Sequence, residues 1–382
     1  MNLPLHWGKT TLGESCDFLN GKAHEQNIDK NGDFIVVNSK FIASEGAVNK
    51  KTNSALFPLF KNDIAMVISD VPKGRALAKC YLIEEDNKYS LNQRICVIRS
   101  TKFDFKFLFY QLNRNQYFLQ FDDGDSQTNL RKEDILNCPL YLPPIAEQKR
   151  IAAILDKADA IRRKRQEAIK LTEEFARSLF LDMFGDPVTN PKNWSVDLFG
   201  NVGKLDRGKS KHRPRNEPSL LGGKHPLIQT GDVANCKGII KSYTQTYSDK
   251  GLAQSKMWPS GTLCITIAAN IAETGILGFD ACFPDSIVGF IPSLQVTTEY
   301  IQGWLEFLQP ILEANAPQSA QKNINLDILR NLKLPIPPIE KQKKYSSLVQ
   351  FLRSSITKNE QDKNYLENLF NSLLQRAFKG EL

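Results

Sequence analysis

The chain contains one segment twice, separated by about half of its length. Residues 143–149 read PPIAEQK and residues 337–343 read PPIEKQK, an offset of 194 residues in a chain of 382. The match at this offset continues without a gap to Phe184 and Phe378. Solenoid repeats recur every 20–50 residues or so, so one recurrence at this distance indicates a tandem duplication. We therefore expect two similar halves.

Each diproline introduces a long segment without a helix breaker. Residues 145–184 and 339–379 contain no Gly or Pro. Forty helical residues at about 1.5 Å each form a rod of roughly 60 Å. Apolar residues of the first segment fall on three adjacent heptad positions, a stripe broad enough for a partner helix. The sequence predicts one long helix over 145–185 and another over 339–382.

A mixed region precedes each long helix. Short apolar runs alternate there with Gly, Pro and Asn turns, which is typical of strands, and an aromatic-rich helical stretch follows. The expected strands are 34–37, 64–69, 95–98, 227–229, 263–267 and 287–291, and the expected helices are 103–121 and 300–314. We interpret each region as an α+β globule.

Four parts therefore follow one another: a globule at 1–144, a helix at 145–185, a globule at 186–338 and a helix at 339–382. A second helix that packs on the first has to run back, so we expect an antiparallel coiled coil with pseudo-twofold symmetry. Double-stranded DNA has this symmetry, and dimeric readers bind two half-sites about one helical turn apart. The net charge of +8 permits a polyanionic partner without demanding one.

Two alternatives to DNA recognition are compatible with these features. A non-catalytic coiled-coil scaffold with two protein-binding heads has the same architecture, and sequence-selective, salt-dependent binding of duplex DNA would distinguish the two. A standalone enzyme needs chemistry that the sequence does not offer, because it has no Asn/Asp-Pro-Pro-aromatic tetrad and no GxGxxG fingerprint. Residues 203–210 (GKLDRGKS) fit the P-loop pattern, but Pro214 and Pro218 interrupt the helix that should follow.

The spacing of the cysteines and the length of the apolar runs bear on redox state, metal binding and membrane insertion. The seven cysteines are scattered, and the closest two, Cys80 and Cys96, lie 16 residues apart. This spacing predicts reduced thiols and no metal site. No apolar run approaches the roughly 18 residues of a membrane span, and the first residues lack a signal-peptide apolar region. We expect a cytoplasmic protein without a membrane partner.

The order of globule, diproline segment and long helix, present twice, closely resembles the specificity subunit of bacterial type I restriction-modification systems. Residues 140–156 and 334–343 carry the resemblance, and residues 225–232 (HPLIQTGD) and 259–267 are similar to the family's target recognition domain. The resemblance covers the whole chain. One departure is the start of the second helix, where residues 345–349 read YSSLV instead of an apolar Ile-Ala-x-x-Leu.

The resemblance implies a function and partners. Two target recognition domains would each read one half of a bipartite, asymmetric DNA site, and the helices would space the domains and dock two methylation (M) subunits. A restriction (R) subunit would be an optional further partner. The chain itself would hold no catalytic residue and no cofactor, because S-adenosylmethionine belongs to the M subunit of this family.

Candidate DNA contacts lie on polar and basic loops. Arg and Lys bind phosphates, and Arg, Gln and Asn also pair with base edges. The predicted contacts are Lys22, His24, Lys73, Arg75, Gln127, Asn129, Arg207, Lys209, Lys211, His212, Arg213, Arg215, Gln321, Lys322 and Asn323. Alternatively, the basic loop at 207–215 is only solvated, and the Gln/Asn pairs cap short helices.

Candidate partner contacts lie on the apolar stripes of the two helices. The predicted residues are Ile151, Ile154, Leu155, Ile161, Phe175, Leu179, Leu348, Leu352, Leu366 and Leu373. The aromatic residues between 103 and 110 are interpreted as core rather than as a base-stacking surface. The basic run 162–165 could face DNA that passes between the heads, but we interpret it as a solvated or subunit-facing surface.

Overall fold

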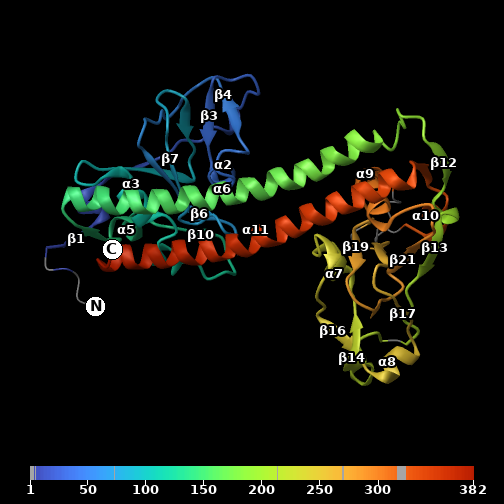
Figure 1. The fold of residues 1–382 in the computed structure, drawn as a ribbon. Helices are drawn as coiled ribbons and strands as arrows, with labels where there is room; N and C mark the ends of the chain where they lie inside the picture. The colour runs from blue at the N-terminus through green and yellow to red at the C-terminus, as the bar shows by residue number, and fades with distance from the viewer. Residues whose placement is uncertain (1–3, 5, 73, 213, 269–270, 316–323) are drawn as a thin grey trace. The chain divides into compact units, whose positions relative to one another are not determined.

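Figure 1 shows the computed structural model of the chain, which describes residues 4, 6–72, 74–212, 214–268, 271–315 and 324–382. The chain divides into two compact units, residues 1–165 with 363–382 and residues 166–362. Each unit combines one globular head with part of both long helices, α6 (Ile145–Phe184) and α11 (Ile339–Lys379). The compact units therefore cut across the four consecutive parts of the sequence.

The two long helices occupy the predicted segments. Gly185 and Gly380 follow them with φ of +79° and +72°, the left-handed conformation that commonly ends a helix. Within unit one, the beginning of α6 meets the end of α11, where Arg150 donates a hydrogen bond to the Leu382 main-chain oxygen at 2.5 Å. Within unit two, the end of α6 meets the beginning of α11. Both pairings are antiparallel, as predicted.

The head of unit one (residues 6–144, the first head) contains a four-stranded and a three-stranded sheet. Their strand orders are β2 (Asp17–Asn20), β9 (Ile95–Arg99), β5 (Ile64–Val67), β7 (Cys80–Leu82) and β4 (Lys50–Thr52), β3 (Phe34–Val37), β8 (Tyr89–Leu91). Two short pairs are β1 (Gly8–Thr11) with β11 (Pro139–Leu142) and β6 (Ser69–Asp70) with β10 (Thr128–Asn129). The helices are α1 (Leu12–Ser15), η1 (Glu25–Asn27), α2 (Ser39–Ala43), α3 (Phe105–Leu112), α4 (Gln116–Leu119) and α5 (Lys132–Leu136).

The head of unit two (residues 186–338, the second head) has a related plan. Its five-stranded sheet runs β13 (Gly203–Arg207), β21 (Ile287–Pro292), β18 (Leu263–Thr266), β19 (Thr274–Leu277), β15 (Gly238–Ile240). A four-stranded sheet runs β16 (Gln245–Tyr247), β14 (Leu221–Leu227), β20 (Ala281–Cys282), β17 (Met257–Trp258), and β12 (Ser195–Leu198) pairs with β22 (Lys333–Ile336). The helices are η2 (Phe199–Asn201), η3 (Pro218–Leu220), α7 (Thr230–Ala234), α8 (Asp249–Ala253), α9 (Thr298–Asn315) and α10 (Leu326–Arg330).

The repeated Gln of the diproline motif joins each head to its long helix. In unit one, the Gln148 side chain accepts a hydrogen bond from the Asp104 amide at 2.8 Å and donates one to the Pro143 carbonyl at 2.8 Å. In unit two, Gln342 accepts from the Thr297 amide at 3.0 Å and donates to the Pro337 carbonyl at 2.8 Å. Both amides are buried. The motif recurs because its Gln has the same structural task twice.

Some local predictions were wrong. The predicted helix 103–121 is interrupted at residues 113–115, so α3 and α4 replace it, whereas α9 continues through Pro310. The strand expected at 227–229 ends at Leu227. The aromatic residues of α3 are core, as interpreted, since Phe107 is fully buried in a cluster with Ile151 and Leu155 of α6. No described helix is long and apolar enough to cross a membrane.

Candidate nucleic-acid interface

One end of the main sheet of the first head is lined by loops, and we call residues 20–25, 68–72, 74–77, 92–94 and 127–129 its loop edge. Strands β2, β9 and β5 are neighbours, so the loop after β2, the turn before β9 and the loop after β5 lie in a row. The Gly21 amide donates to the Ile95 carbonyl at 3.1 Å, and the Ile68 amide donates to the Arg94 carbonyl at 3.2 Å. These bonds hold the three segments together.

The structure brings two predicted contact loops together at this edge. Asp70 accepts hydrogen bonds from the Ala76 and Leu77 amides at 2.7 and 3.1 Å, which folds the loop that presents exposed Arg75. Strand β6 pairs with β10, which carries Asn129. The Gln127 amide also donates to the Ser69 hydroxyl at 3.1 Å.

The helix-capping alternative for Gln127 and Asn129 is wrong. Helix α5 begins after Arg131, and the carboxylate of Asp134 accepts the Arg131 amide at 3.2 Å. Gln127 and Asn129 are exposed and precede that cap. Nearby, hydrogen bonds from the Ser126 amide, the Asp125 amide and the Ser126 hydroxyl lower the pKa of Asp123. The Asp123 carboxylate therefore keeps its charge to lower pH than an ordinary aspartate does.

The structure contradicts the prediction that His24 contacts DNA. Its side chain is 0% exposed, with Nδ1 2.6 Å from the Lys22 carbonyl and Nε2 2.7 Å from the Ser90 hydroxyl. Both ring nitrogens are thus engaged inside the head. Lys22 itself is exposed, so His24 acts on this edge by holding the Lys22 backbone.

The second head has an equivalent loop edge, residues 207–212, 214–215, 267–268 and 284–286. The Gly208 amide donates to the Ile287 carbonyl at 2.8 Å, and the Lys209 amide donates to the Phe283 carbonyl at 3.0 Å. In the first head, the Gly21 and Lys22 amides make the same bonds to Ile95 and Leu91. The basic loop therefore begins at the position of the Lys22 loop.

The basic loop is anchored through its backbone, which leaves its side chains outward. The Lys211 and His212 amides donate to the Gln254 side-chain oxygen at 2.6 and 3.0 Å. The Arg215 guanidinium forms an ion pair with Asp285. Arg207, Lys209, Lys211, His212 and Arg215 are all exposed.

The P-loop interpretation has no structural support, because β13 covers Gly203–Arg207. An extended strand cannot form the phosphate-binding loop that this motif requires. Among the described residues, no group of three His, Cys, Asp or Glu side chains is arranged for a metal. The predicted contacts Lys73, Arg213, Gln321, Lys322 and Asn323 lie outside the described residues.

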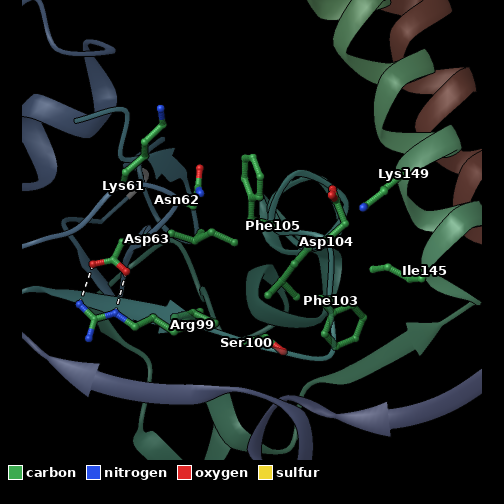
Figure 2. A pocket seen from close by; sticks show the side chains of 13 residues that line it. Lys61, Asn62, Asp63, Arg99, Ser100, Phe103, Asp104, Phe105, Ile145 and Lys149 are labelled. Atoms are coloured by element: carbon green, nitrogen blue, oxygen red, sulfur yellow. Dashed lines mark hydrogen bonds and ion pairs between the residues drawn. The ribbon is translucent and has the colours of Figure 1, made fainter. Parts of the chain in front are cut away.

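The opposite end of the first head's sheet faces α6. A cavity of about 470 Å³ lies there, lined by Arg99 at the end of β9 and by Ile145 and Lys149 of α6. Figure 2 shows these side chains. Arg99 binds the buried carboxylate of Asp63 with two hydrogen bonds of 2.6 and 2.7 Å. The two ends of β9 therefore differ in role, since one meets the long helix and the other ends in the loop edge.

The predicted partner contacts divide into buried and exposed residues. Ile151 and Leu155 are fully buried against the first head, so the prediction that they face a partner is wrong. Leu179 and Leu373 are half-buried against the cores, and Ile154, Leu352 and Leu366 are also half-buried. Ile161, Phe175 and Leu348 are 55%, 57% and 37% exposed. Six further exposed apolar residues of α6 and α11 were not predicted: Ile145, Leu171, Leu181, Phe351, Tyr365 and Leu369.

Two residues of the basic run 162–165 form ion pairs within the chain. Arg162 bonds to Asp159 at 2.6 Å and to Glu367 of α11 at 3.3 Å. Arg163 bonds to the same Asp159 at 2.6 Å and to Glu45 of the first head at 3.6 Å. These pairs join the head, α6 and α11 within unit one, so Arg162 and Arg163 serve contacts inside the chain, which the sequence did not predict.

A family model described as type I restriction modification DNA specificity domain matches residues 4–171 and 191–368. The chain therefore belongs to this family and contains two copies of its domain. A type I restriction enzyme EcoBI specificity subunit of Escherichia coli is 22% identical over 76% of this chain and 69% of its own. The MjaVIII specificity subunit of Methanocaldococcus jannaschii is 20% identical over 100% and 94%.

Two solved structures share the fold. The S subunit of a type I restriction-modification system from M. genitalium covers 99% of this chain and 96% of its own, with a TM-score of 0.61 and 16% identity. A chain from a structure on complex assembly and conformational transition of the type I R-M system covers 100% of both chains, with a TM-score of 0.57 and 20% identity. The α+β heads with long helices are thus the family's fold.

Proposed function

We propose that this chain is the DNA-specificity subunit of a type I restriction-modification complex, in which each head reads one half of a bipartite, asymmetric site. One observation carries the proposal: both heads form the same loop edge with the same backbone hydrogen bonds, yet present different side chains on it. Two heads with the same backbone framework and different exposed side chains are suited to read two unlike half-sites. Family membership supports the same role.

The proposal includes partners for the long helices. Exposed apolar residues such as Ile161, Phe175 and Phe351 recur along the two long helices, and apolar and aromatic side chains are the residues that a protein interface covers at its centre. They suit docking of two M subunits, which would bring S-adenosylmethionine and the catalytic residues, with an R subunit as an optional addition. The specificity chain would then contribute recognition and spacing, without catalysis of its own.

Genome-wide mapping of methylated adenine, in cells with and without this gene, tests the proposal. We expect one split motif to disappear on deletion. Exchange of residues 1–144 for those of another specificity subunit should change one half of the motif only. An unchanged map, with the M subunit expressed, would contradict the proposal and favour a protein-binding scaffold.

A further inference from the structure

A short turn occupies equivalent positions in the two loop edges. In the first head it is residues 92–94, where the Ile95 amide donates to the Asn92 carbonyl at 3.1 Å. In the second head it is residues 284–286, where the Ile287 amide donates to the Pro284 carbonyl at 3.0 Å. The last residue of each turn also accepts an amide from the loop after the neighbouring strand, Ile68 or Ile267. The two turns are therefore the same structural element.

The turn lies at the centre of each edge. Strand order places it between the Lys22 loop after β2 and the Arg75 loop after β5. Neighbouring strands are about 4.8 Å apart, so these three strand ends span about 10 Å. The major groove of B-DNA is about 12 Å wide. A sheet edge of this size presents its central turn to the groove while the flanking loops reach the phosphates.

The side chains of the first turn suit base readout. Arg94 is exposed, and the described residues give its guanidinium no hydrogen-bond or ion-pair partner. Gln93 is exposed, and among the described residues its side-chain amide has one long contact, 3.4 Å to Glu25. Arg pairs with the O6 and N7 atoms of guanine, and Gln pairs with adenine. The Arg94 guanidinium, at the centre of the edge, can therefore form its hydrogen bonds with a base.

The equivalent turn of the second head has opposite chemistry. Asp285 and Ser286 replace Gln93 and Arg94, and Asp285 forms an ion pair with Arg215 of the basic loop. A guanidinium therefore reaches the centre of this edge from the neighbouring loop. The carboxylate restricts its orientation, which favours directional bonding to a base over a diffuse phosphate contact.

We infer that these turns are specificity-determining elements: Arg94 reads a guanine in one half-site, and Arg215, oriented by Asp285, reads a base in the other. The inference rests on the proposed function and deepens it, because it names the positions where the two heads differ in what they recognise. Lys22 and Lys209, which are equivalent in the two heads, would then serve phosphates in both.

The test is selection of bound sequences from a random duplex DNA library by the full chain assembled with its M subunit. Arg94→Ala should lower the preference for one base pair in one half-site by roughly five- to hundredfold. The other half-site should be unchanged. Lys61→Ala is the matched control, because it removes an exposed cation at the opposite end of β5. It should leave both half-sites intact.

A second variant guards against a folding defect. Exchange of Gln93-Arg94 for Asp-Ser keeps polar side chains in the turn and should alter the first half-site alone. If Arg94→Ala weakens binding to all sequences equally, or if the exchange changes no base preference, the inference is wrong and the proposed function stands. If the unmodified complex selects no split motif, the proposed function itself fails.

Discussion

The hydroxyl of Tyr345, on α11, lies against Gly303 of α9, where a Cβ atom would come within 2.6 Å of it. Tyr345 is buried among Phe180 and Phe184 of α6. Asp104 and Thr297 donate equivalent amides to the two motif Gln residues, and counted from them Tyr110 of α3 is the equivalent of Gly303. Counted from Gln148, Ile151 is the equivalent of Tyr345. Unit two therefore has its tyrosine on the long helix, at the first of the departing residues 345–349, where unit one has it on the head helix.

The effect of Gly303→Ala on stability should depend on which residue stands at position 345. Overpacking a core by one methyl group costs about 1–3 kcal/mol, so the variant should lower the free energy of unfolding of unit two by that amount. The added methyl group would also come within 2.8 Å of the Phe180 ring. Tyr345→Ile removes the hydroxyl obstruction and should therefore reduce, but not abolish, the cost of the alanine. Denaturant unfolding of the single and double variants measures this coupling, and strictly additive effects would contradict the packing account.

The motif Gln residues predict a matched pair of stability effects. Gln148→Leu leaves the Asp104 amide and the Pro143 carbonyl without their partner. Unsatisfied buried groups cost about 1–3 kcal/mol each, and we expect a loss of that order in unit one. Gln342→Leu should do the same in unit two. Hydrogen exchange followed by mass spectrometry measures the stability of each unit separately. If Gln148→Leu increased exchange equally in both units, the effect of this Gln would not be local to unit one.

Buried thiols predict a loss of stability in alkali. Burial raises the pKa of Cys138 to about 12, against about 8.5 in an unfolded chain. Between these values the folded state binds the proton and the unfolded state releases it. The free energy of unfolding therefore falls as pH rises through this window, by about 1.4 kcal/mol per pH unit for this thiol.

Thermal unfolding of the parent and of Cys138→Ala, from about pH 8 to about pH 11, checks this expectation. The variant starts from a lower stability because it loses buried volume, but its decline with pH should be shallower. Parallel curves for the two proteins would show that this thiol does not titrate in the unfolded state as assumed.

The basic loop predicts a change in salt dependence. Lys209→Ala and Lys211→Ala should weaken binding of a random-sequence duplex, and each should reduce the slope of log affinity against log salt by about 1. Base preference should not change. Lys333→Ala is the control, because this exposed lysine lies on β22 beside α11 rather than on the loop edge. Fluorescence anisotropy at several salt concentrations measures the slope, and an unaltered slope would mean that neither lysine contacts a phosphate.

The long helices could be predicted closely because their limits are local. A diproline begins each, no Gly or Pro interrupts it, and a Gly follows, so α6 has the expected bounds. The heptad pattern showed which positions are apolar but not which face meets the head. Ile151 and Leu155 were therefore assigned to a partner although the head covers them.

The candidate interface was only partly predictable because non-local pairing builds it. Lys22 and His24 are both polar residues of one loop. The sequence does not show that the His24 ring is buried against Ser90, which lies 66 residues away in the chain. The turn at Gln93 and Arg94 has no signal of its own in the sequence. It becomes conspicuous when strand order places β9 between β2 and β5.

The composition of unit one has a consequence for synthesis on the ribosome. Its core includes Ala377 and, half-buried beside it, Phe370 and Phe378. These residues are made only after the whole second head has emerged. The core of unit one therefore stays incomplete, with the apolar surface of α6 uncovered, while unit two is translated. Unit two is continuous in the chain and is under no such delay. Damage near the C-terminus should accordingly impair the head that was translated first.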